Sequence, residues 1–225
     1  MSLLSLRLKR WRANRRDLQA PMQQLVARPI PGPATPFGEL EFVALDLETT
    51  SLDPASADML SVGWVVIRSG RVDLNSAASY LVRPSGDVGS SASVHGLTDT
   101  VVEGGQDWSI VLSKIVEALT GRVLLVHHAG LDQALLDRLC RQRFGAPMLV
   151  PVVDTLALEH RRQRRRHHVD EARSLRLPDL RTEYGLPTYA AHDSLVDAIA
   201  TAELLIAMVA HNDGAANTRL RDLCV

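Results

Sequence analysis

Residues 41–50 read EFVALDLETT and begin as a strand that is suited to burial. Four apolar residues at 42–45 come first, and two carboxylates, Asp46 and Glu48, follow on either side of Leu47. Successive side chains of a strand point to opposite faces, so the two carboxylates share one face. Because neighbouring carboxylates repel each other and are costly to bury unpaired, this pair requires a compensating partner.

The stretches that follow predict a mixed sheet. Runs at 41–47, 59–67 and 71–82, with Ser69 and Gly70 as a tight turn, predict three antiparallel strands. Two short apolar runs, at 122–127 and 150–154, predict strands that are buried on both faces. Apolar residues at helical spacing predict helices at 107–120, at about 131–142 and from near 194. This succession is typical of an α/β fold with a mixed five-stranded sheet flanked by helices.

Four parts are predicted along the chain. Residues 1–27 form a basic amphipathic extension, with apolar side chains roughly on one stripe (Leu4, Leu8, Trp11, Leu18, Met22 and Leu25). Residues 28–38, RPIPGPATPFG, form a proline-rich linker. Residues 39–211 form the main domain, and residues 212–225 form a C-terminal tail.

Composition excludes several classes of protein. The chain has 225 residues, of which 46% are hydrophobic and 23% are charged, as in ordinary globular domains. No apolar run approaches the roughly 20 residues of a membrane span, and arginines occupy the N-terminus where a signal peptide needs an apolar core. Cys140 and Cys224 are the two cysteines, so a disulfide framework is not expected and a reducing cytoplasm fits.

Positive charge gathers at two places. Residues 7–16 hold six cations and residues 161–166 hold five arginines, although the formal net charge is −1. Clustered arginine suits phosphate binding, and the more acidic remainder suits a site that collects cations. Residues 160–173 show no periodicity and are expected to form a loop, which is either merely solvated or attracts a nucleic-acid backbone.

Two more acidic residues and a histidine lie at the ends of predicted elements. Asp132 falls at a helix start in HHAGLD (127–132). AHDSLVDA (191–198) places His192 before the last helix and Asp197 in its first turn. Sites in such sheets gather at the C-terminal ends of parallel strands, where these residues and the opening carboxylates all lie.

Oxygen-rich clusters of this kind suit hard divalent cations such as Mg²⁺. A pair of such ions can clamp the attacking and leaving oxygens of a phosphoryl transfer. Metal binding would relieve the repulsion between Asp46 and Glu48. His192, with a reference pKa near 6.5, suits removal of a proton from the attacking water.

Seven stretches resemble the DnaQ-like (DEDD) 3′-to-5′ exonucleases, and within that family the histidine subgroup that contains the proofreading subunit of the bacterial replicative polymerase. They follow the family order over about 40–210: DLETTSL (46–52), SVGWVVI (61–67), ASVHGLTD (92–99), LVHHAGLDQALL (125–136), VVDTLAL (152–158), LPDLRTEYGLPT (177–188) and AHDSLVDAIATAELL (191–205). A lone D-x-E is common by chance, whereas seven motifs in order are specific.

The resemblance implies an RNase H-like fold and a 3′-5′ exonuclease that releases nucleoside 5′-monophosphates from single-stranded nucleic acid, with DNA preferred over RNA. It implies two divalent ions, Mg²⁺ with Mn²⁺ as a substitute, held by four carboxylates (Asp46, Glu48, Asp132 and Asp197). His192 is the implied general base. Thr49 and Leu52 are expected beside the terminal nucleotide, and His128 is expected to face substrate.

The sequence departs from the family pattern at two positions. Ser51 stands where relatives usually have glycine, and His128 stands where many have asparagine. Ser51 places a Cβ in a turn that glycine fills easily, but neither change removes a metal ligand.

A polymerase or another protein is an expected partner through residues 1–27. The alternative functions are an exoribonuclease acting on RNA 3′ ends, and a nucleic-acid- or partner-binding module with little catalysis.

Overall fold

A computed structural model describes residues 2–83, 104–165, 174–190, 192–212 and 214–224. The motif at 92–99 and the second half of the predicted loop, 166–173, lie outside these ranges. The elements follow in this order: α1 (Leu3–Asn14), α2 (Met22–Ala27), a 3-10 turn η1 (Phe37–Glu39), β1 (Phe42–Thr49), β2 (Met59–Arg68), β3 (Arg71–Leu81), α4 (Trp108–Leu119), β4 (Val123–Val126), α5 (Ala129–Phe144), β5 (Val152–Asp154), α6 (Thr155–Arg165), α7 (Leu177–Glu183), α8 (Ser194–His211), α9 (Gly214–Asn217) and α10 (Leu220–Leu223).

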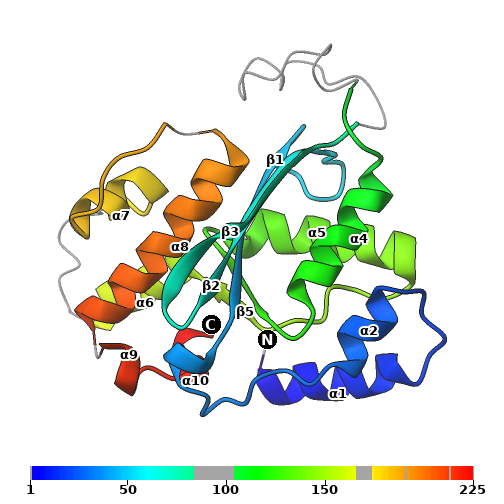
Figure 1. Ribbon diagram of the computed structural model, residues 1–225, viewed down its shortest axis with the longest axis horizontal. Coiled ribbons are helices and arrows are strands. Elements are labelled where there is room, and N and C mark those ends of the chain that lie inside the picture. The colour runs from blue at the N-terminus through cyan, green and yellow to red at the C-terminus, as the bar shows by residue number, and fades with distance from the viewer. Residues whose placement is uncertain (1, 84–103, 166–173, 191, 213, 225) are drawn as a thin grey trace.

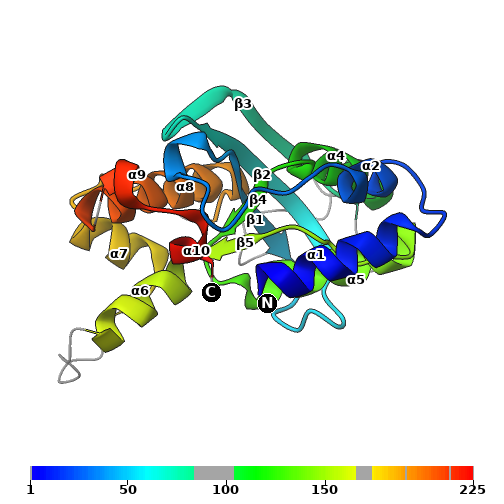
Figure 2. The same ribbon diagram turned by 90° about the horizontal axis from the view of Figure 1, so that it is seen from below.

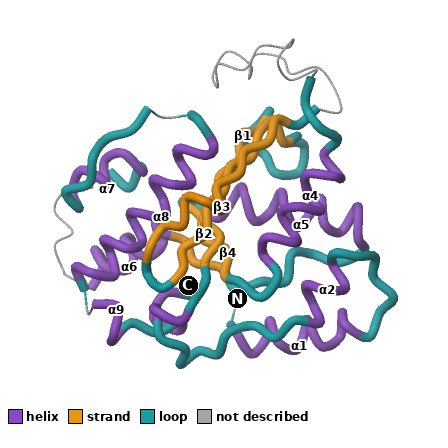
Figure 3. Tube along the Cα trace, viewed as in Figure 1, coloured by secondary structure: helices purple, strands orange, loops and turns teal. Residues whose placement is uncertain are grey.

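The five strands form one mixed sheet in the order β3-β2-β1-β4-β5. Figure 3 shows the strands, in orange, between two groups of helices. Strands β1, β2 and β3 pair antiparallel, and β4 and β5 join β1 in parallel. The predicted α/β architecture with a five-stranded mixed sheet is therefore confirmed. Each predicted strand corresponds to an observed one, because the apolar runs match the pleat of a buried sheet.

Helices cover both faces of the sheet, which Figure 1 shows nearly edge-on: α1, α2, α4 and α5 on one side, and α6, α7 and α8 on the other. The alternation of β1 assigns each side chain to a face. Val43 and Leu45 belong to the hydrophobic cluster with α4 and α5, and Phe42 and Ala44 belong to the cluster with α8. Asp46 continues the second set, so its carboxylate emerges on the face that α8 covers.

Helix α8 lies against β2 at a glycine. A Cβ built on Gly63 would lie 2.2 Å from the backbone nitrogen of Leu195 in the first turn of α8. Next to this contact, the Ser61 and Ser194 hydroxyls are hydrogen-bonded at 3.2 Å. Gly63 pairs with Asp46 across the β1–β2 ladder, so the close approach brings the start of α8 to the carboxylates.

The N-terminal residues pack differently from the predicted stripe. Leu4, Leu8 and Trp11 are exposed by 79%, 48% and 52%, whereas Leu6 and Arg10 are buried. The expected stripe assumed one continuous helix, but the chain turns between α1 and α2, as Figure 2 shows from below. The division into extension, linker, domain and tail stays a prediction.

The hydrogen bonds of Arg10 determine which face of α1 is buried. Its guanidinium donates to the backbone carbonyls of Leu149, Leu25 and Arg28, the last at 2.5 Å. Burial lowers the pKa of Arg10 to about 10, and the three carbonyls compensate for lost water. Leu6 and Ala13, on the same side of α1, join the hydrophobic cluster of the sheet.

The first part of the predicted loop is wrong, because residues 160–165 continue helix α6. Asp154 accepts hydrogen bonds from the backbone nitrogens of Leu156 (3.0 Å) and Ala157 (3.3 Å) and so caps the start of this helix. Arginine favours helices, and Arg161 donates to backbone carbonyls of the C-terminal segment. These tertiary contacts replace the missing apolar periodicity.

Among the described helices, α8 meets the length and composition of a membrane span, and half of that window is buried inside the protein. It packs against β1, β2 and β3. A core helix that lies on a sheet has the same length and composition.

Replacing Gly63 with alanine should destabilise the protein by about 1–3 kcal/mol, because the new methyl group must displace the backbone of α8. Urea unfolding would measure the loss. Gly38→Ala is the matched control, since a Cβ there meets nothing within 4 Å. Equal stability of the Gly63 variant and wild type would show that α8 is not held against β2.

Candidate active site

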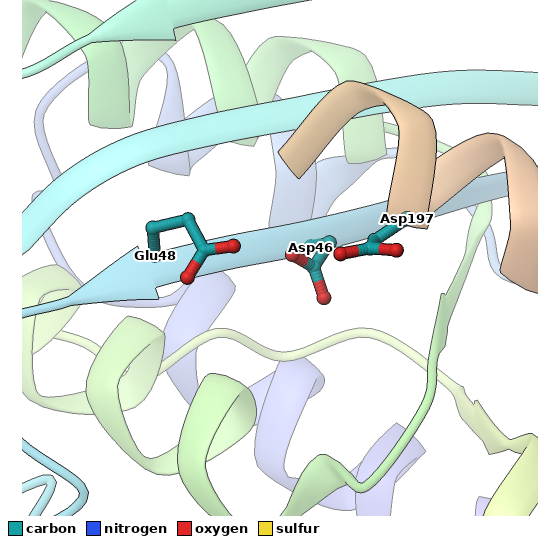
Figure 4. Close-up of side chains that lie close together, drawn as sticks. All are labelled: Asp46, Glu48 and Asp197. Carbon is teal, nitrogen blue, oxygen red and sulfur yellow. The ribbon is translucent and has the colours of Figure 1, made fainter. Parts of the chain in front are cut away.

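Three of the predicted carboxylates converge in space. One oxygen each from Asp46, Glu48 and Asp197 can be chosen so that all three lie within 4.8 Å of one another. Figure 4 shows the first two side chains on β1 and the third on α8, where Asp197 lies in the first turn. The separation suits one small cation that all three residues contact.

The turn before α8 orients Asp197. Asp193 caps the helix by accepting from the backbone nitrogens of Leu195 (3.0 Å) and Val196 (3.1 Å). The backbone nitrogen of His192 donates to Asp197 Oδ2 at 2.9 Å. His192 adopts a φ of 71°, a left-handed conformation that is uncommon outside glycine, and its side chain is exposed. The predicted general base and a predicted metal ligand are thus joined through the backbone.

Asp132 occupies the first turn of α5 and is 7% exposed. It is not one of the three residues within 4.8 Å, but its charge raises the pKa of Asp46. The structure therefore places it beside the cluster, on the side of α5.

Burial and mutual repulsion shift the pKa of all four carboxyls upward. Burial is the main cause for each, and neighbouring carboxylates add to it for Asp46, whose pKa lies well above its usual value. The pKa of Glu48 rises to about 7 and that of Asp132 to about 8. The pKa of Asp197 also rises, although the bond from His192 opposes the shift. This excess of buried negative charge fits a hard divalent cation held by carboxylate oxygens.

Asp154 supports the site and was missed by sequence reasoning. It ends β5 and accepts from the backbone nitrogens of His128 (3.0 Å) and Ala129 (2.9 Å). These bonds hold His128 at a φ of 79° and begin α5, which carries Asp132. An acidic residue directly after a short apolar strand, in VVD at 152–154, was the available signal.

His127 has a supporting position. Its Nδ1 lies 2.8 Å from the Thr155 hydroxyl and its Nε2 lies 2.9 Å from the Leu175 carbonyl. A carbonyl only accepts, so Nε2 carries the proton and the neutral ring accepts at Nδ1. Burial lowers the pKa of His127 and favours this neutral form. Both ring nitrogens are engaged away from the carboxylates.

Arg181 fixes the segment that leads to His192. It is 2% exposed and donates to the carbonyls of Ala200 (2.7 Å) and Pro187 (2.8 Å). An ion pair at 2.8 Å joins it to Glu203. One guanidinium thus ties α7 and the segment that follows it to the middle of α8.

The three predicted substrate contacts lie near the end of β1 and the start of α5. Thr49 is buried and its hydroxyl donates to the Ser51 carbonyl at 2.9 Å, so its side chain holds the turn. Leu52 is 87% exposed. His128 lies at the N-cap of α5 and is exposed. Ser51 needs no positive φ, and its hydroxyl accepts from the Asp53 nitrogen at 3.1 Å.

Comparisons with known proteins agree with this geometry. The sequence profile of the RNase_T family, described as "Exonuclease", matches residues 43–205. The chain is 28% identical over 176 residues to a DNA polymerase III of PolC type from Thermotoga maritima, covering 77% of this chain but 12% of that protein. It is 28% identical over 177 residues to the DNA polymerase III subunit epsilon of Treponema pallidum, covering 76% of this chain and 77% of that protein.

Solved structures share the fold. Exonuclease I of E. coli, in complex with a dT13 oligonucleotide, superposes with a TM-score of 0.65 and 15% sequence identity. The match covers 82% of this chain and 42% of that chain. The RNase H-like fold that the resemblance implied is confirmed.

The raised pKa values make stability depend on pH. In the presence of a chelator, the free energy of unfolding should fall as pH rises from about 5 to about 8, because folded Glu48 and Asp132 retain protons that the unfolded chain releases near pH 4. Urea titrations at several pH values would measure the slope. Asp132→Asn should flatten it, and Mg²⁺ should restore stability most at high pH, where the carboxylates are ionised. An identical slope in the variant would contradict these pKa shifts.

Asp154→Asn should weaken the turn that begins α5. Loss of the charged acceptor for His128 and Ala129 should cost about 1–3 kcal/mol of stability and reduce the affinity for Mg²⁺ by displacing Asp132. Asp107→Asn is the control, since Asp107 caps α4 in the same way. Thermal unfolding with and without Mg²⁺ would separate the two variants. An equal Mg²⁺ response in both would exclude a role for Asp154 in the site.

Proposed function

The chain belongs to the exonuclease family, and we propose that it removes nucleotides one at a time from the 3′ end of single-stranded nucleic acid, with DNA preferred over RNA. The convergence of Asp46, Glu48 and Asp197 within 4.8 Å is the observation that carries this proposal. Relatives named as DNA polymerase III proteins favour DNA. The chain spans only 12% of the first of these relatives, so the preference for DNA is part of the proposal.

The carboxylates have distinct roles in the proposed reaction. Asp46, Glu48 and Asp197 would hold one divalent ion, and Asp46 and Asp132 would hold a second, with Mg²⁺ as the natural ion and Mn²⁺ as a substitute. When bound, two such ions stabilise the negative charge on the attacking and leaving oxygens of phosphodiester hydrolysis.

His192 would act as the general base. The imidazole is exposed beside the cluster, and its backbone is tied to Asp197, so the ring can swing over the carboxylates without losing its anchor. It would take a proton from the water that attacks the terminal phosphodiester. The new P–O bond forms as the bond to the 3′ oxygen of the preceding nucleotide breaks. The products are a nucleoside 5′-monophosphate and a strand shortened by one nucleotide.

Thr49, Leu52 and His128 would contact the terminal nucleotide. The exposed Leu52 side chain offers an apolar surface to the last base. Thr49 holds the turn that carries Leu52, and His128 lies at the start of α5 above Asp132. Thr49 ends the strand that carries Asp46 and Glu48, and His128 immediately precedes the helix that carries Asp132.

A protein partner and a cellular location belong to the same proposal. The exposed side chains of Leu4, Leu8 and Trp11 give residues 1–27 a surface for a polymerase or another protein. A cytoplasmic location fits the two unpaired cysteines, Cys140 and Cys224.

A time course on end-labelled single strands of DNA and RNA tests the activity. We expect a stepwise 3′ ladder that requires Mg²⁺ or Mn²⁺ and that runs faster on DNA. His192→Ala should slow it by about 10²–10⁴-fold, the range for loss of a general base, and Asp46→Asn should abolish most of it. Asp73→Asn, a substitution of a half-buried acid on β3 that pairs with Arg68 at 3.1 Å, is the control.

The outcomes separate the candidate functions. A faster ladder on RNA would favour the exoribonuclease. Chelator-resistant binding to either strand with no ladder in wild type would favour the binding module. Full activity of Asp46→Asn would refute the metal-site assignment.

A further inference from the structure

A cavity of about 550 Å³ lies between α6, the end of α8 and the segment 218–223. These elements gather around α9 and α10 in Figure 1, at the opposite end of α8 from the carboxylates. At about 1.5 Å per residue, α8 separates Asp197 from His211, which lines the cavity, by roughly 20 Å. The volume is in the range of small-molecule sites, about 300–1,000 Å³.

Positive charge dominates the rim. Four arginines line the cavity: Arg161, Arg162, Arg165 and Arg221. Arg162 lies 3.8 Å from Glu159, and Arg221 lies 3.8 Å from Asp222, so two of the four charges have a carboxylate nearby. Among the described residues, Arg161 and Arg165 form no ion pair with a carboxylate within 4.0 Å. Two positive charges are thus in excess, which matches the charge of one phosphomonoester.

The walls are held by the rest of the fold. Arg161 donates to the carbonyls of Asp222 and Cys224, the latter at 3.3 Å. The Leu220 nitrogen donates to the Thr35 carbonyl at 3.0 Å, which fastens the same segment to the residues before β1. Arg161 and the segment that carries Arg221 are therefore held in place, so they lose little conformational entropy when a ligand binds.

The floor is apolar. Leu158 of α6, Met208 and Val209 of α8, and Leu223 of α10 line the cavity, and each is exposed by 9% or less, so they offer it a small apolar surface. Inorganic phosphate would leave this surface without a partner, whereas a base or another flat apolar group would cover it. A cationic rim over an apolar floor suits a molecule that carries both a phosphate and an apolar ring.

We propose that this cavity binds a nucleoside monophosphate, with the phosphate between Arg161 and Arg165 and the base on Met208 and Leu223. The phosphomonoester belongs either to a free mononucleotide or to the 5′-phosphorylated end of a strand. The site is separate from the carboxylate cluster and does not depend on metal. Arginine binds phosphate by charge-assisted hydrogen bonds that persist in water at a concave site.

Calorimetric titration of the full chain with dAMP in EDTA tests the proposal. The double variant Arg165→Gln/Arg221→Gln removes two rim charges, and we expect binding at least about tenfold weaker than in wild type. Arg12→Gln/Arg16→Gln, at two exposed positions in and just after α1, is the charge-matched control and should bind as wild type does. Deoxyadenosine and inorganic phosphate should each bind more weakly than dAMP.

Four results would overturn the proposal. They are equal binding in the rim variant and wild type, a requirement for Mg²⁺, affinity for inorganic phosphate as high as for dAMP, and affinity for deoxyadenosine as high as for dAMP. A 5′-phosphorylated oligonucleotide identifies the source: rim-dependent binding of this strand indicates a strand end, and its absence alongside dAMP binding indicates a free nucleotide. The initial rate of 3′ trimming should be the same in the rim and control variants, so binding and nuclease activity are judged separately.

Discussion

The approach of α8 to β2 at Gly63 is the constraint on which the candidate site depends. No side chain separates the first turn of the helix from the strand there, and the Ser61–Ser194 hydrogen bond lies beside the contact. Gly63 is the ladder partner of Asp46. The backbone contact therefore carries Asp197 to within reach of Asp46, which a helix packed at the usual distance through side chains would not achieve.

The two helices that bear carboxylates begin in the same way. His128 precedes α5 and His192 precedes α8, and both adopt a left-handed φ. In each case the histidine backbone nitrogen donates to an aspartate, Asp154 or Asp197. A left-handed conformation costs about 1–3 kcal/mol for a residue with a Cβ, and the charge-assisted hydrogen bonds offset it. The strained backbone therefore lies just before the two helices whose first turns carry Asp132 and Asp197.

Helix α8 separates two electrostatic environments. Acidic residues lie at its start, where the helix dipole favours negative charge, and arginines line the cavity at its end. Buried apolar residues such as Leu204 and Leu205 fill the space between them. The hydrophobic core therefore keeps apart two groups of like charges.

The sequence by itself determined the strands and the position of each carboxylate. Apolar runs such as 42–45 and 123–126 can be buried only in the middle of a sheet, and the alternation of β1 places Asp46 and Glu48 on one face regardless of what packs there. The sequence also predicted that Asp197 lies near them, at the start of the last helix, but the contact of α8 with β2 at Gly63 sets how closely it approaches. Only the tertiary structure decided which face of α1 is buried, that residues 160–165 are helical, and that Asp154 and Arg181 support the site. These features depend on backbone carbonyls and nitrogens of distant segments, such as the Leu149 carbonyl that receives Arg10, and such groups leave no pattern in the local sequence.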